Sequence, residues 1–488
     1  MLCACAFALL QFSPARADGP WEAIARTDLT AIHQLLLDNH PGPVDAQNPN
    51  YRVWLEDGYR KEMDAANSAQ NFYDYKRVIL GYVNGFRDGH SNIAPTVDAV
   101  QFEWPGFLPG VGADGRIYVS VSEQDGVSIG DEILSCDSTP IGELFERNVA
   151  PYRWNRDIPQ QRDLFVPMTL LTDAGDTKVK PNKCDLKAGG QVRTVPLQWR
   201  YVSRAKALDL RAQASGRTIP QLGLRKIDGI WFLSLPGFDY QSGADVARFK
   251  QVLKDVSAHE TELRNAERLV IDVRGNRGGI SDWCLTAAGN VWGDAIVKKV
   301  AASLPGDVDW RASKANLAHI ENFLNDAKQN GLPQDDIDEL TGVRDSMLKA
   351  IAEGRPFAHE PSPVSPAPDL SSVRLKGTVY FLTDGICTSA CLDFADVVLR
   401  LPNVVQVGRA TDADASYIDL NDATLPSGLG RFQYSMKVYR TRVRGNNEWY
   451  EPTYKWPGGL MTDDAVAKWI ATLPLAAPGA HTPKPHHV

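Results

Sequence analysis

From Gly229 onward, short and continuous apolar runs alternate with segments whose apolar residues recur at helical spacing. The runs lie at 230–235, 269–273, 379–382 and 404–407, and the helical segments lie at 245–262, 280–292 and 389–399. A continuous apolar run is typical of a strand buried on both faces, and intervening helices make such strands parallel. The sequence therefore predicts an α/β unit of βαβ type in this half of the chain.

The composition narrows the class of protein. The chain has 488 residues, which is enough for two to four domains. Its hydrophobic content of 43% and charged content of 23% are ordinary for a soluble globular protein. A net charge of -8 argues against nucleic acid as the main partner. No internal segment of the sequence has 18 consecutive apolar residues, so we expect no membrane-spanning helix after the N-terminus.

The N-terminus has the pattern of a secretory signal peptide. An apolar run at 2–12 precedes Ala15-Arg16-Ala17, which is a small-x-small cleavage pattern. The basic residues that normally open such a signal are missing, and a disordered apolar tail is the alternative interpretation. The pattern favours a signal peptide over 1–17 and hence a periplasmic or secreted protein.

Removal of that segment leaves five of the seven cysteines: Cys136, Cys184, Cys284, Cys387 and Cys391. An odd number leaves at least one thiol unpaired within the monomer, and one or two disulfides suit an oxidising periplasm. We expect a bridge between Cys284 and Cys391, whose helices follow neighbouring strands, with Cys387 as the alternative partner. The sequence has no CxxC and no Cys/His cluster, so we expect no zinc or other metal and no cofactor.

The predicted organisation is a multidomain α+β fold. Its parts after the signal are a helical domain, a domain of short strands, the α/β unit with a helical insertion, and a tail; they span 18–98, 99–203, 204–480 with the insertion at about 295–370, and 481–488. In the second part, the run from Gly126 to Leu134 resembles the "G-x-x-x-GD-x-I-L" run of PDZ-like domains. Residues 150–185 exceed what a compact PDZ fold needs, so we expect an insertion there.

A candidate nucleophile lies where the apolar run at 378–382 ends. Asp384-Gly385 is a turn signal, and the small residues Thr388-Ser389-Ala390 lead into the next helical segment. A serine at such a junction projects its hydroxyl from the carboxyl edge of the sheet, where a helix N-terminus favours developing negative charge. The position suits a nucleophile, and simple capping of the helix by Ser389 is the alternative.

The run at 269–273 leads into a glycine-rich turn, Arg274-Gly275-Asn276-Arg277-Gly278-Gly279. Paired glycines after a buried strand let backbone N–H groups approach a ligand closely, and near a helix N-terminus they form an anion-binding nest. A plain βα turn is the alternative. A phosphate loop is less favoured, because neither GxGxxG nor GxxxxGK[ST] is present.

These motifs together resemble one family, the C-terminal processing (tail-specific) serine peptidases and the tricorn core protease. The run 272–279 is similar to its "D-x-R-x-N-x-GG" motif, Ser389 lies where the family carries its nucleophile, and 407–411 is similar to its "hxGxxT" strand-turn. The order of helical, PDZ-like and βαβ domains also matches. The resemblance implies a ClpP/crotonase-like catalytic domain and a serine peptidase.

One departure bears on the mechanism. The bacterial processing branch pairs its serine with a lysine about one strand and turn later, but no lysine lies between Lys376 and Lys437. The tricorn-like branch instead uses a histidine from the preceding helical region, followed by a small polar residue. His90-Ser91 resembles that element, with Ser91 as an orienting group. A histidine has an unperturbed pKa near 6.5, so it can accept the serine proton at neutral pH.

The resemblance also suggests the remaining groups of the site. Because the tricorn-like branch carries its glutamate in a late segment, Glu451 is the preferred third member and Glu448 the alternative, although both can equally be solvated surface residues. The backbone N–H groups of Gly278, Gly279 and Ala390 are the candidate oxyanion donors.

The predicted function is a secreted or periplasmic serine peptidase that acts on a peptide or protein, which can add as a strand to the PDZ-like domain. Two alternatives share the scaffold. One is a non-peptidase acyl hydrolase such as an esterase. The other is a non-catalytic peptide- or lipid-binding protein. The sequence does not set the oligomeric state.

Overall fold

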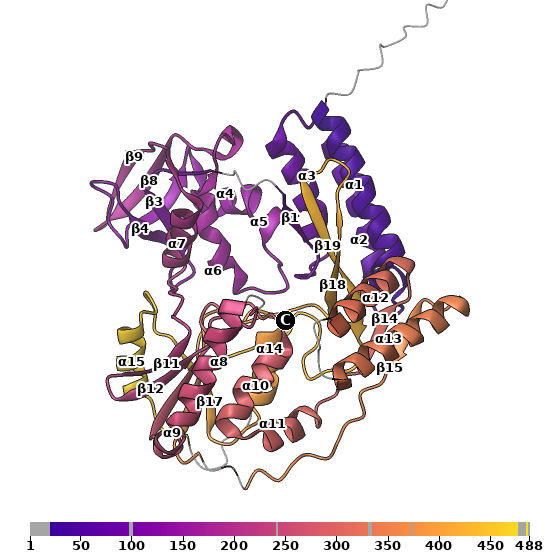
Figure 1. Ribbon diagram of the computed structural model, residues 1–488. Coiled ribbons are helices and arrows are strands. Elements are labelled where there is room, and N and C mark those ends of the chain that lie inside the picture. The colour runs from indigo at the N-terminus through magenta and orange to yellow at the C-terminus, as the bar shows by residue number, and fades with distance from the viewer. Residues whose placement is uncertain are drawn as a thin grey trace, which may run out of the picture.

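The computed structural model describes residues 20–96, 101–240, 243–329, 334–371, 373, 375–476 and 485–486 of the chain (Figure 1). The predicted signal peptide at 1–17 lies outside these residues. Helices and strands are both abundant, which agrees with the predicted α+β class. Among the described residues, no helix has the length and apolar character needed to cross a membrane.

The α/β unit is built on a six-stranded sheet. In sheet order its strands are β11 (Gly223–Ile227), β12 (Ile230–Ser234), β13 (Arg268–Asp272), β16 (Thr378–Thr383), β17 (Val404–Gly408) and β21 (Tyr454–Lys455). Strands β12 to β21 run parallel, and β11 joins β12 antiparallel at one edge. The parallel sheet expected from the apolar runs is therefore confirmed.

Helices cover both faces of this sheet. One face carries α8 (Gly243–Ala258), α10 (Ser281–Trp292) and α14 (Ala390–Val398), whose apolar side chains share a core with β13 and β16. The other face carries α15 (Asp463–Thr472), which packs on β12, β16 and β17. Strand β16 is buried at every position, because it has neighbours on both faces and both edges.

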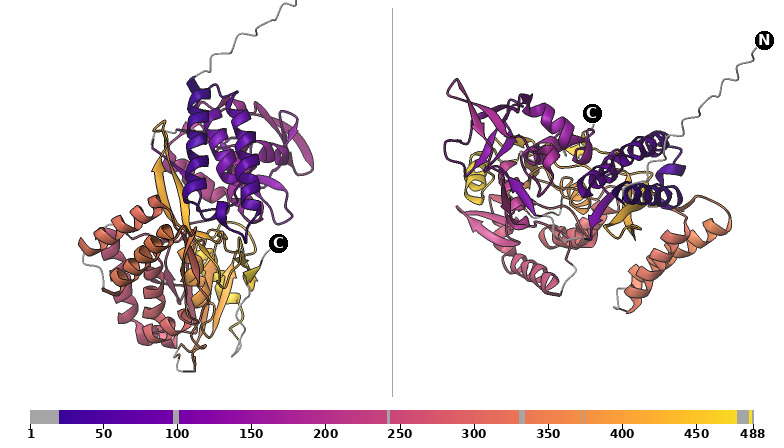
Figure 2. Two further views of the ribbon diagram at one scale, coloured as in Figure 1. Left: turned by 90° about the vertical axis from the view of Figure 1, so that its right-hand side faces the viewer. Right: turned by 90° about the horizontal axis from the view of Figure 1, so that it is seen from above.

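The N-terminal helices rest on a second sheet. They are α1 (Pro20–Asn39), α2 (Asn50–Ala66) and α3 (Phe72–Asn84). The sheet contains β1 (Asn92–Pro95), β14 (Val308–Arg311), β15 (Phe357–Glu360), β18 (Tyr417–Thr424) and β19 (Gly430–Tyr439). Leu29, Leu36 and Tyr82 pack with residues of β18 and β19 in one core. Figure 2 shows β19 and β18 rising beside the indigo helices from the lower half of the molecule.

The segment predicted as a helical insertion is partly strand. It contains α11 (Asp294–Ala301), α12 (Lys314–Gln329) and α13 (Gln334–Ala352), but also β14 and β15, which pair with each other. Strand β14 then pairs with β19 near the C-terminal end of the chain. The insertion thus completes the sheet that supports the N-terminal helices.

The middle of the chain forms a separate core. Its main sheet has the order β3 (Phe107–Val111), β4 (Ile117–Ser122), β5 (Glu132–Cys136), β8 (Lys183–Ala188), β9 (Gln191–Pro196), with β6 (Thr139–Pro140) on β5. A smaller sheet holds β2 (Phe102–Trp104), β7 (Thr172–Asp173) and β10 (Arg200–Val202). The helices are α4 (Ile141–Asn148), α5 (Ala150–Arg153), α6 (Gln161–Phe165) and α7 (Arg204–Ala214). Ala207, Leu210 and Ala214 of α7 belong to this core, which therefore extends beyond residue 203.

Two disulfides are present in the described residues, and the expected Cys284–Cys391 bridge is wrong. Cys136 pairs with Cys184 across β5 and β8, and Cys387 pairs with Cys391. Cys284 is a fully buried free thiol on α10. The turn at Ser389 brings the Cα atoms of Cys387 and Cys391 to 5.2 Å, so these two cysteines pair, while Cys284 packs in the same apolar core from α10. In the expected tail, Pro485–His486 form β22, which pairs with β20 (Trp449–Tyr450).

Candidate active site

Ser389 lies at the junction between β16 and α14, at the N-cap position of the helix. Its backbone has φ 55° and ψ -131°, in a region that residues with a side chain rarely occupy. The side chain makes no capping hydrogen bond, whereas the carbonyl oxygen accepts from the N–H of Leu392 at 2.7 Å. Capping is therefore not what the hydroxyl does here. Backbone strain of this kind clusters at functional sites.

Contacts on several sides hold this turn. The disulfide between Cys387 and Cys391 spans Ser389. The hydroxyl of Thr388 donates to the carbonyl of Ala413 at 3.3 Å. Before the turn, the buried carboxylate of Asp384 accepts from the N–H of Gly275 at 3.0 Å, which ties the turn after β16 to the turn after β13.

The glycine-rich turn after β13 packs directly against the serine. A Cβ at Gly278 would lie 2.7 Å from the carbonyl oxygen of Thr388 and 2.8 Å from the Cβ of Ser389, so only glycine fits. The turn is shaped by Asn276, whose Oδ1 accepts from the N–H of Gly278 at 2.8 Å. Arg274 and Asp272 form a buried ion pair at the base of the turn, with Nη2 2.6 Å from Oδ2.

The candidate oxyanion donors differ in what they already bind. The N–H of Gly278 is used by Asn276. Gly279 lines the same pocket as Ser389, and within the described chain its N–H has no acceptor among the hydrogen bonds of the turn. Ala390 is the first residue of α14, where a backbone N–H has no intrahelical acceptor. Gly279 and Ala390 therefore have N–H groups available for a ligand.

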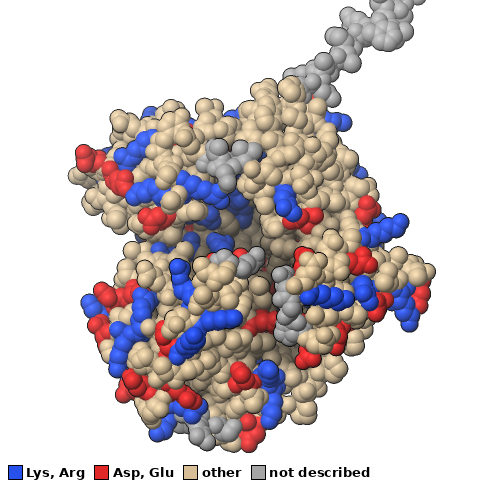
Figure 3. Space-filling model, in the orientation of Figure 1, with Lys and Arg blue, Asp and Glu red and all other residues tan. Residues whose placement is uncertain are grey.

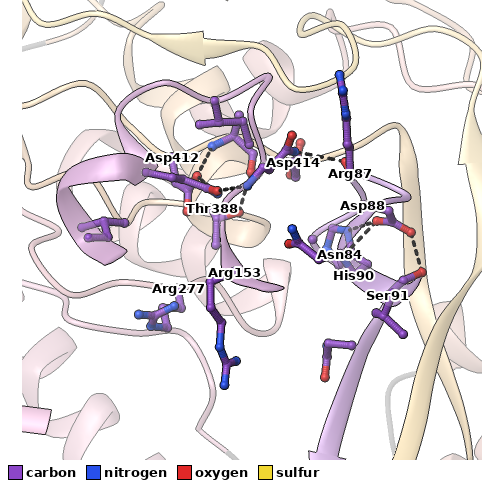
Figure 4. A pocket seen from close by; sticks show the side chains of 18 of the residues that line it. Asn84, Arg87, Asp88, His90, Ser91, Arg153, Arg277, Thr388, Asp412 and Asp414 are labelled. Carbon is purple, nitrogen blue, oxygen red and sulfur yellow. Dashed lines mark hydrogen bonds and ion pairs between the residues drawn. The ribbon is translucent and has the colours of Figure 1, made fainter. Parts of the chain in front are cut away.

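A pocket of about 780 Å³ joins Ser389 to His90. His90 lies in the loop between α3 and β1, so the pocket brings together distant parts of the chain. Figure 3 shows a hollow between the upper and lower halves of the molecule with basic side chains on both of its edges. Figure 4 shows His90, Asp88 and Ser91 on one wall of the pocket and Thr388, Asp412 and Asp414 on another.

Asp88 organises the loop that carries His90. Its carboxylate accepts from the N–H of His90 at 2.9 Å and from the hydroxyl of Ser91 at 2.8 Å. It also lies 3.3 Å from Nε2 of the buried His40. Nδ1 of His40 accepts from the N–H of Gly42, so the proton of His40 is on Nε2. This Nε2–H donates a hydrogen bond to Asp88. Burial by itself raises the pKa of Asp88, but this hydrogen bond and the neighbouring histidines hold the pKa below its ordinary value.

The imidazole of His90 lies beside Asp88 without a hydrogen bond at its Nδ1. Its Nδ1 is buried, has no hydrogen bond, and lies 3.9 Å from Oδ1 of Asp88. Within the described part of the chain, no hydrogen bond joins His90 to Ser389, although both line the pocket. The structure therefore brings the two residues to one cavity, but their side chains are not within the hydrogen-bond distance that proton transfer needs.

The two glutamates expected near the histidine lie elsewhere. Glu451 accepts from the indole N–H of Trp449 at 3.0 Å and pairs with Lys455 at 3.0 Å. Glu448 accepts from the N–H of Gly445 at 2.6 Å. Neither glutamate lines the pocket of Ser389 and His90, whereas three aspartates do: Asp88, Asp412 and Asp414.

Asp414 is the second acid near the histidine. Its Oδ1 binds Arg442 at 2.9 Å and Arg444 at 2.6 Å, and its Oδ2 is buried without a hydrogen bond. Burial raises the pKa of Asp414, but the two arginines and His90 together lower it below the ordinary value. Asp414 is thus an anion anchored mainly by guanidinium groups.

Lys437, the first lysine after Lys376, is engaged away from the pocket. Its Nζ lies 2.8 Å from Oδ2 of Asp419 and 4.6 Å from the ring centroid of Trp310. Burial lowers the pKa of Lys437, but the ion pair with Asp419 raises it overall. Across the described residues, no group of His, Cys, Asp and Glu side chains could hold a metal ion.

Sequence reasoning did not single out several residues of the pocket. Asp88 was within reach, because it opens the Asp88-Gly89-His90-Ser91 step in which an aspartate can bond the backbone two residues later. Arg153, Arg211 and Arg277 line the pocket from three separate segments. No local signal connects these arginines.

A comparison with models of known protein families finds a match over the larger part of the α/β unit. Residues 230–448 match the model of peptidase family S41, a segment that includes Ser389 and the glycine pair but not His90. No curated protein matches the sequence.

The fold is similar to solved structures of CPAF. Mature CPAF complexed with lactacystin has 16% identity and a TM-score of 0.61, over 90% of this chain and 95% of that chain. Another structure of mature CPAF has 15% identity and a TM-score of 0.61, over 90% and 94%. At these identities the likeness is one of fold.

Proposed function

Since this chain belongs to peptidase family S41 and is a serine-type peptidase, a hydrolase, we propose that it cleaves peptide bonds with Ser389 as the nucleophile and His90 as the general base. The observation that carries this assignment is the strained turn at Ser389. The serine makes no capping hydrogen bond through its side chain, and it lines the pocket that His90 also lines. A base near a serine hydroxyl is the arrangement that nucleophilic catalysis requires.

In the proposed reaction, the hydroxyl oxygen of Ser389 attacks the carbonyl carbon of the scissile bond while His90 takes the hydroxyl proton. His90 then gives this proton to the leaving amine, and water hydrolyses the acyl-enzyme in the same way. Asp88 acts as the positioning residue, because it holds the backbone of His90 and lies 3.9 Å from its Nδ1. This role replaces the one expected for Glu451, which is bound to Trp449 and Lys455.

The tetrahedral oxyanion lies between the N–H groups of Gly279 and Ala390 in this proposal. Gly278 has a different task, since its N–H is bound to Asn276 and its missing side chain lets the turn contact Ser389. A preorganised donor of this kind contributes roughly 3 kcal/mol in the transition state.

Catalysis in this scheme requires the pocket to close. His90 belongs to the N-terminal helical region and Ser389 to the α/β unit, and no hydrogen bond joins them within the described chain. Substrate that binds between the two units can bring the imidazole to the serine, as closing motions do in many enzymes.

The PDZ-like region is the proposed holding site for the peptide. A cavity of about 580 Å³ lies between β4 and α7, lined by Ser120, Val121, Lys206 and Leu210 among others. Strand β4 pairs with β3 along its length but with β5 at Tyr118. The second edge of the stretch 120–122 therefore has no strand partner in these pairings, and the stretch lines the cavity. An extended peptide can pair with such a strand through its main chain.

A periplasmic or secreted location follows from the same proposal. The disulfides Cys136–Cys184 and Cys387–Cys391 form and persist in an oxidising compartment. The division into units at 18–98, 99–203 and 204–480 is likewise proposed, with α7 assigned to the core of the middle unit.

The test is labelling with a fluorophosphonate probe, followed by hydrolysis of a mixed peptide library. Wild-type protein should take up the probe and cleave peptides, and Ser389→Ala should do neither while its circular dichroism stays unchanged. Equal turnover by Ser389→Ala overturns the assignment. Cleavage of ester substrates alone favours an acyl hydrolase, and no labelling of the wild-type protein favours a binding protein.

A further inference from the structure

Three arginines form a cluster on the wall of the Ser389 pocket. Arg153 ends α5, Arg211 lies on α7, and Arg277 lies in the glycine-rich turn beside the serine. Figure 4 shows the side chains of Arg153 and Arg277 extending into the same part of the pocket. Arg277 directly precedes Gly278, whose Cα faces the Cβ of Ser389, so the cluster begins next to the reacting group.

The three arginines of this cluster carry positive charges that are not neutralised by direct contact among the described residues. Within the described residues, none of the three arginines forms an ion pair with a carboxylate. Arg211 donates from Nε to the carbonyl of Leu164 at 3.1 Å, and its guanidinium lies 5.1 Å from the ring centroid of Phe165. Burial, with the like charges of Arg153 and Arg277, lowers the pKa of Arg211 to about 9. The guanidinium groups thus repel each other. Burial lowers the pKa of Arg153, and the charge of Asp173 offsets this only in part, because Asp173 is paired with Lys76.

The acidic residues of the pocket do not fill this need, because they are already engaged. Asp88 binds His40 and Ser91, and Asp414 binds Arg442 and Arg444. Burial raises the pKa of Asp412, and the charge of Arg277 acts in the opposite direction. The Oδ1 of Asp412 already accepts from Gln161 at 2.7 Å and from the N–H of Ala413 at 2.8 Å. Close to the nucleophile, the pocket therefore contains arginines that form no ion pair with its acidic residues.

From this arrangement, and on the basis of the proposed peptidase function, we infer that Arg153, Arg211 and Arg277 bind a carboxylate of the substrate and make the enzyme select peptides with an acidic group near the scissile bond. A guanidinium presents a planar fork of N–H donors that matches a carboxylate in two-point contact. The carboxylate supplies the missing counter-ion, and it can come from an Asp or Glu side chain or from a free C-terminus.

The experiment compares cleavage of matched peptides by the wild-type protein. Each pair differs in one group near the scissile bond: Glu against Gln, Asp against Asn, and a free against an amidated C-terminus. We expect kcat/KM to be at least about tenfold higher for the carboxylate in one of these arms, since a charged hydrogen bond contributes more than a neutral one. The arm that shows the difference identifies the source of the carboxylate. Higher ionic strength should reduce it.

Variants assign the effect to the cluster. Arg277 is exposed, so Arg277→Gln should fold normally, and its ratio of kcat/KM for the carboxylate peptide over the amide peptide should fall toward one. Arg277→Glu should reverse the preference toward a Lys-containing peptide. Arg344→Gln removes the same charge from α13, where Arg344 pairs with Asp345 outside the pocket, and should keep the wild-type preference.

A binding measurement separates this inference from the peptidase proposal. Fluorescence anisotropy with Ser389→Ala protein and the same labelled peptides reports on the cluster without catalysis. Equal Kd for acid and amide peptides, or equal kcat/KM in the wild-type protein, overturns the inference even if peptides are cleaved. If the acid peptide binds more tightly but the wild-type protein cleaves no peptide, the inference about the arginine cluster holds and the peptidase assignment is wrong.

Discussion

The disulfide between Cys387 and Cys391 encloses Ser389, which stands midway between the two cysteines. Both half-cystines are fully buried, and Ser389 between them holds a positive φ of 55°. With its ψ of -131°, this backbone lies in a sparsely populated region that costs a residue with a side chain about 1–3 kcal/mol. The covalent loop therefore opposes relaxation of the turn to ordinary helical geometry.

Breaking this loop should lower kcat. In the double variant Cys387→Ser/Cys391→Ser, we expect a fall of about tenfold or more in kcat, because the serine is then less well preorganised. The measurement is steady-state hydrolysis together with the rate of fluorophosphonate labelling. Cys136→Ser/Cys184→Ser removes the other disulfide and should leave both rates of the folded protein near wild type. Equal losses in the two double variants would contradict a local role.

The general base should be His90 rather than a displaced lysine. His90→Ala should lose several orders of magnitude in kcat, as loss of the base does in serine proteases. Lys437→Ala should have little effect on kcat, because Lys437 is paired with Asp419 outside the pocket. Wild-type activity should fall on acidification, since an imidazolium cannot accept the serine proton. Loss of activity in Lys437→Ala with retention in His90→Ala would instead establish a Ser-Lys dyad.

Asp88 should position His90, and Glu451 should not. Asp88→Asn should lower kcat by about 10² or more, because the amide no longer stabilises the imidazolium that forms during attack. The acid limb of its pH–rate profile should also move to lower pH, an effect that a purely structural residue does not produce. Glu451→Gln should leave both kcat and the profile unchanged. The reverse result would restore the glutamate as the third member.

Gly278→Ala should disturb the nucleophile through a direct contact. The added Cβ would lie 2.7 Å from the carbonyl oxygen of Thr388, so the turn at Ser389 must shift and kcat should fall. Gly130 is a matched control, because its φ of 94° resembles the 90° of Gly278 but a Cβ there meets nothing within 4 Å. Both variants should lose about 1–2 kcal/mol of stability from the positive φ. Only Gly278→Ala should lose activity, and equal kcat in the two variants would contradict the contact.

Asp412 should make the stability of the protein depend on pH. Burial raises the pKa of Asp412 to about 6, whereas an unfolded aspartate titrates near 3.9. Between about pH 4 and 6 the folded state holds a proton that the unfolded state has released, so the free energy of unfolding falls as pH rises through this window. The size is up to about 3 kcal/mol.

The matched variant for this effect is Asp412→Asn, which keeps the Oδ1 acceptor for Gln161 and Ala413 but does not titrate. Urea unfolding at pH 4, 5, 6 and 7 should give similar stability for both proteins at pH 4 and a more stable variant at pH 7. Curves for the two proteins that stay parallel across the range would show that Asp412 titrates normally in the folded state.

The sequence by itself determined the local architecture around the nucleophile. The apolar runs at 269–273 and 379–382 predict neighbouring parallel strands, and β13 and β16 are such a pair. The small residues around Ser389 and the glycine pair at 278–279 predict the two tight turns at the carboxyl edge. These features depend on neighbours in the chain, since periodicity and turn chemistry act over a few residues.

Only the tertiary structure decided which distant groups share the pocket. His90 reaches it because the N-terminal helices pack on β18 and β19, and Arg153, Arg211 and Arg277 converge on it from three elements. The choice of Asp88 over Glu451 near His90, and of Cys387 over Cys284 as the partner of Cys391, also depends on that packing. Such contacts arise when separately folded surfaces are brought together, and no short-range pattern in the sequence encodes how those surfaces meet.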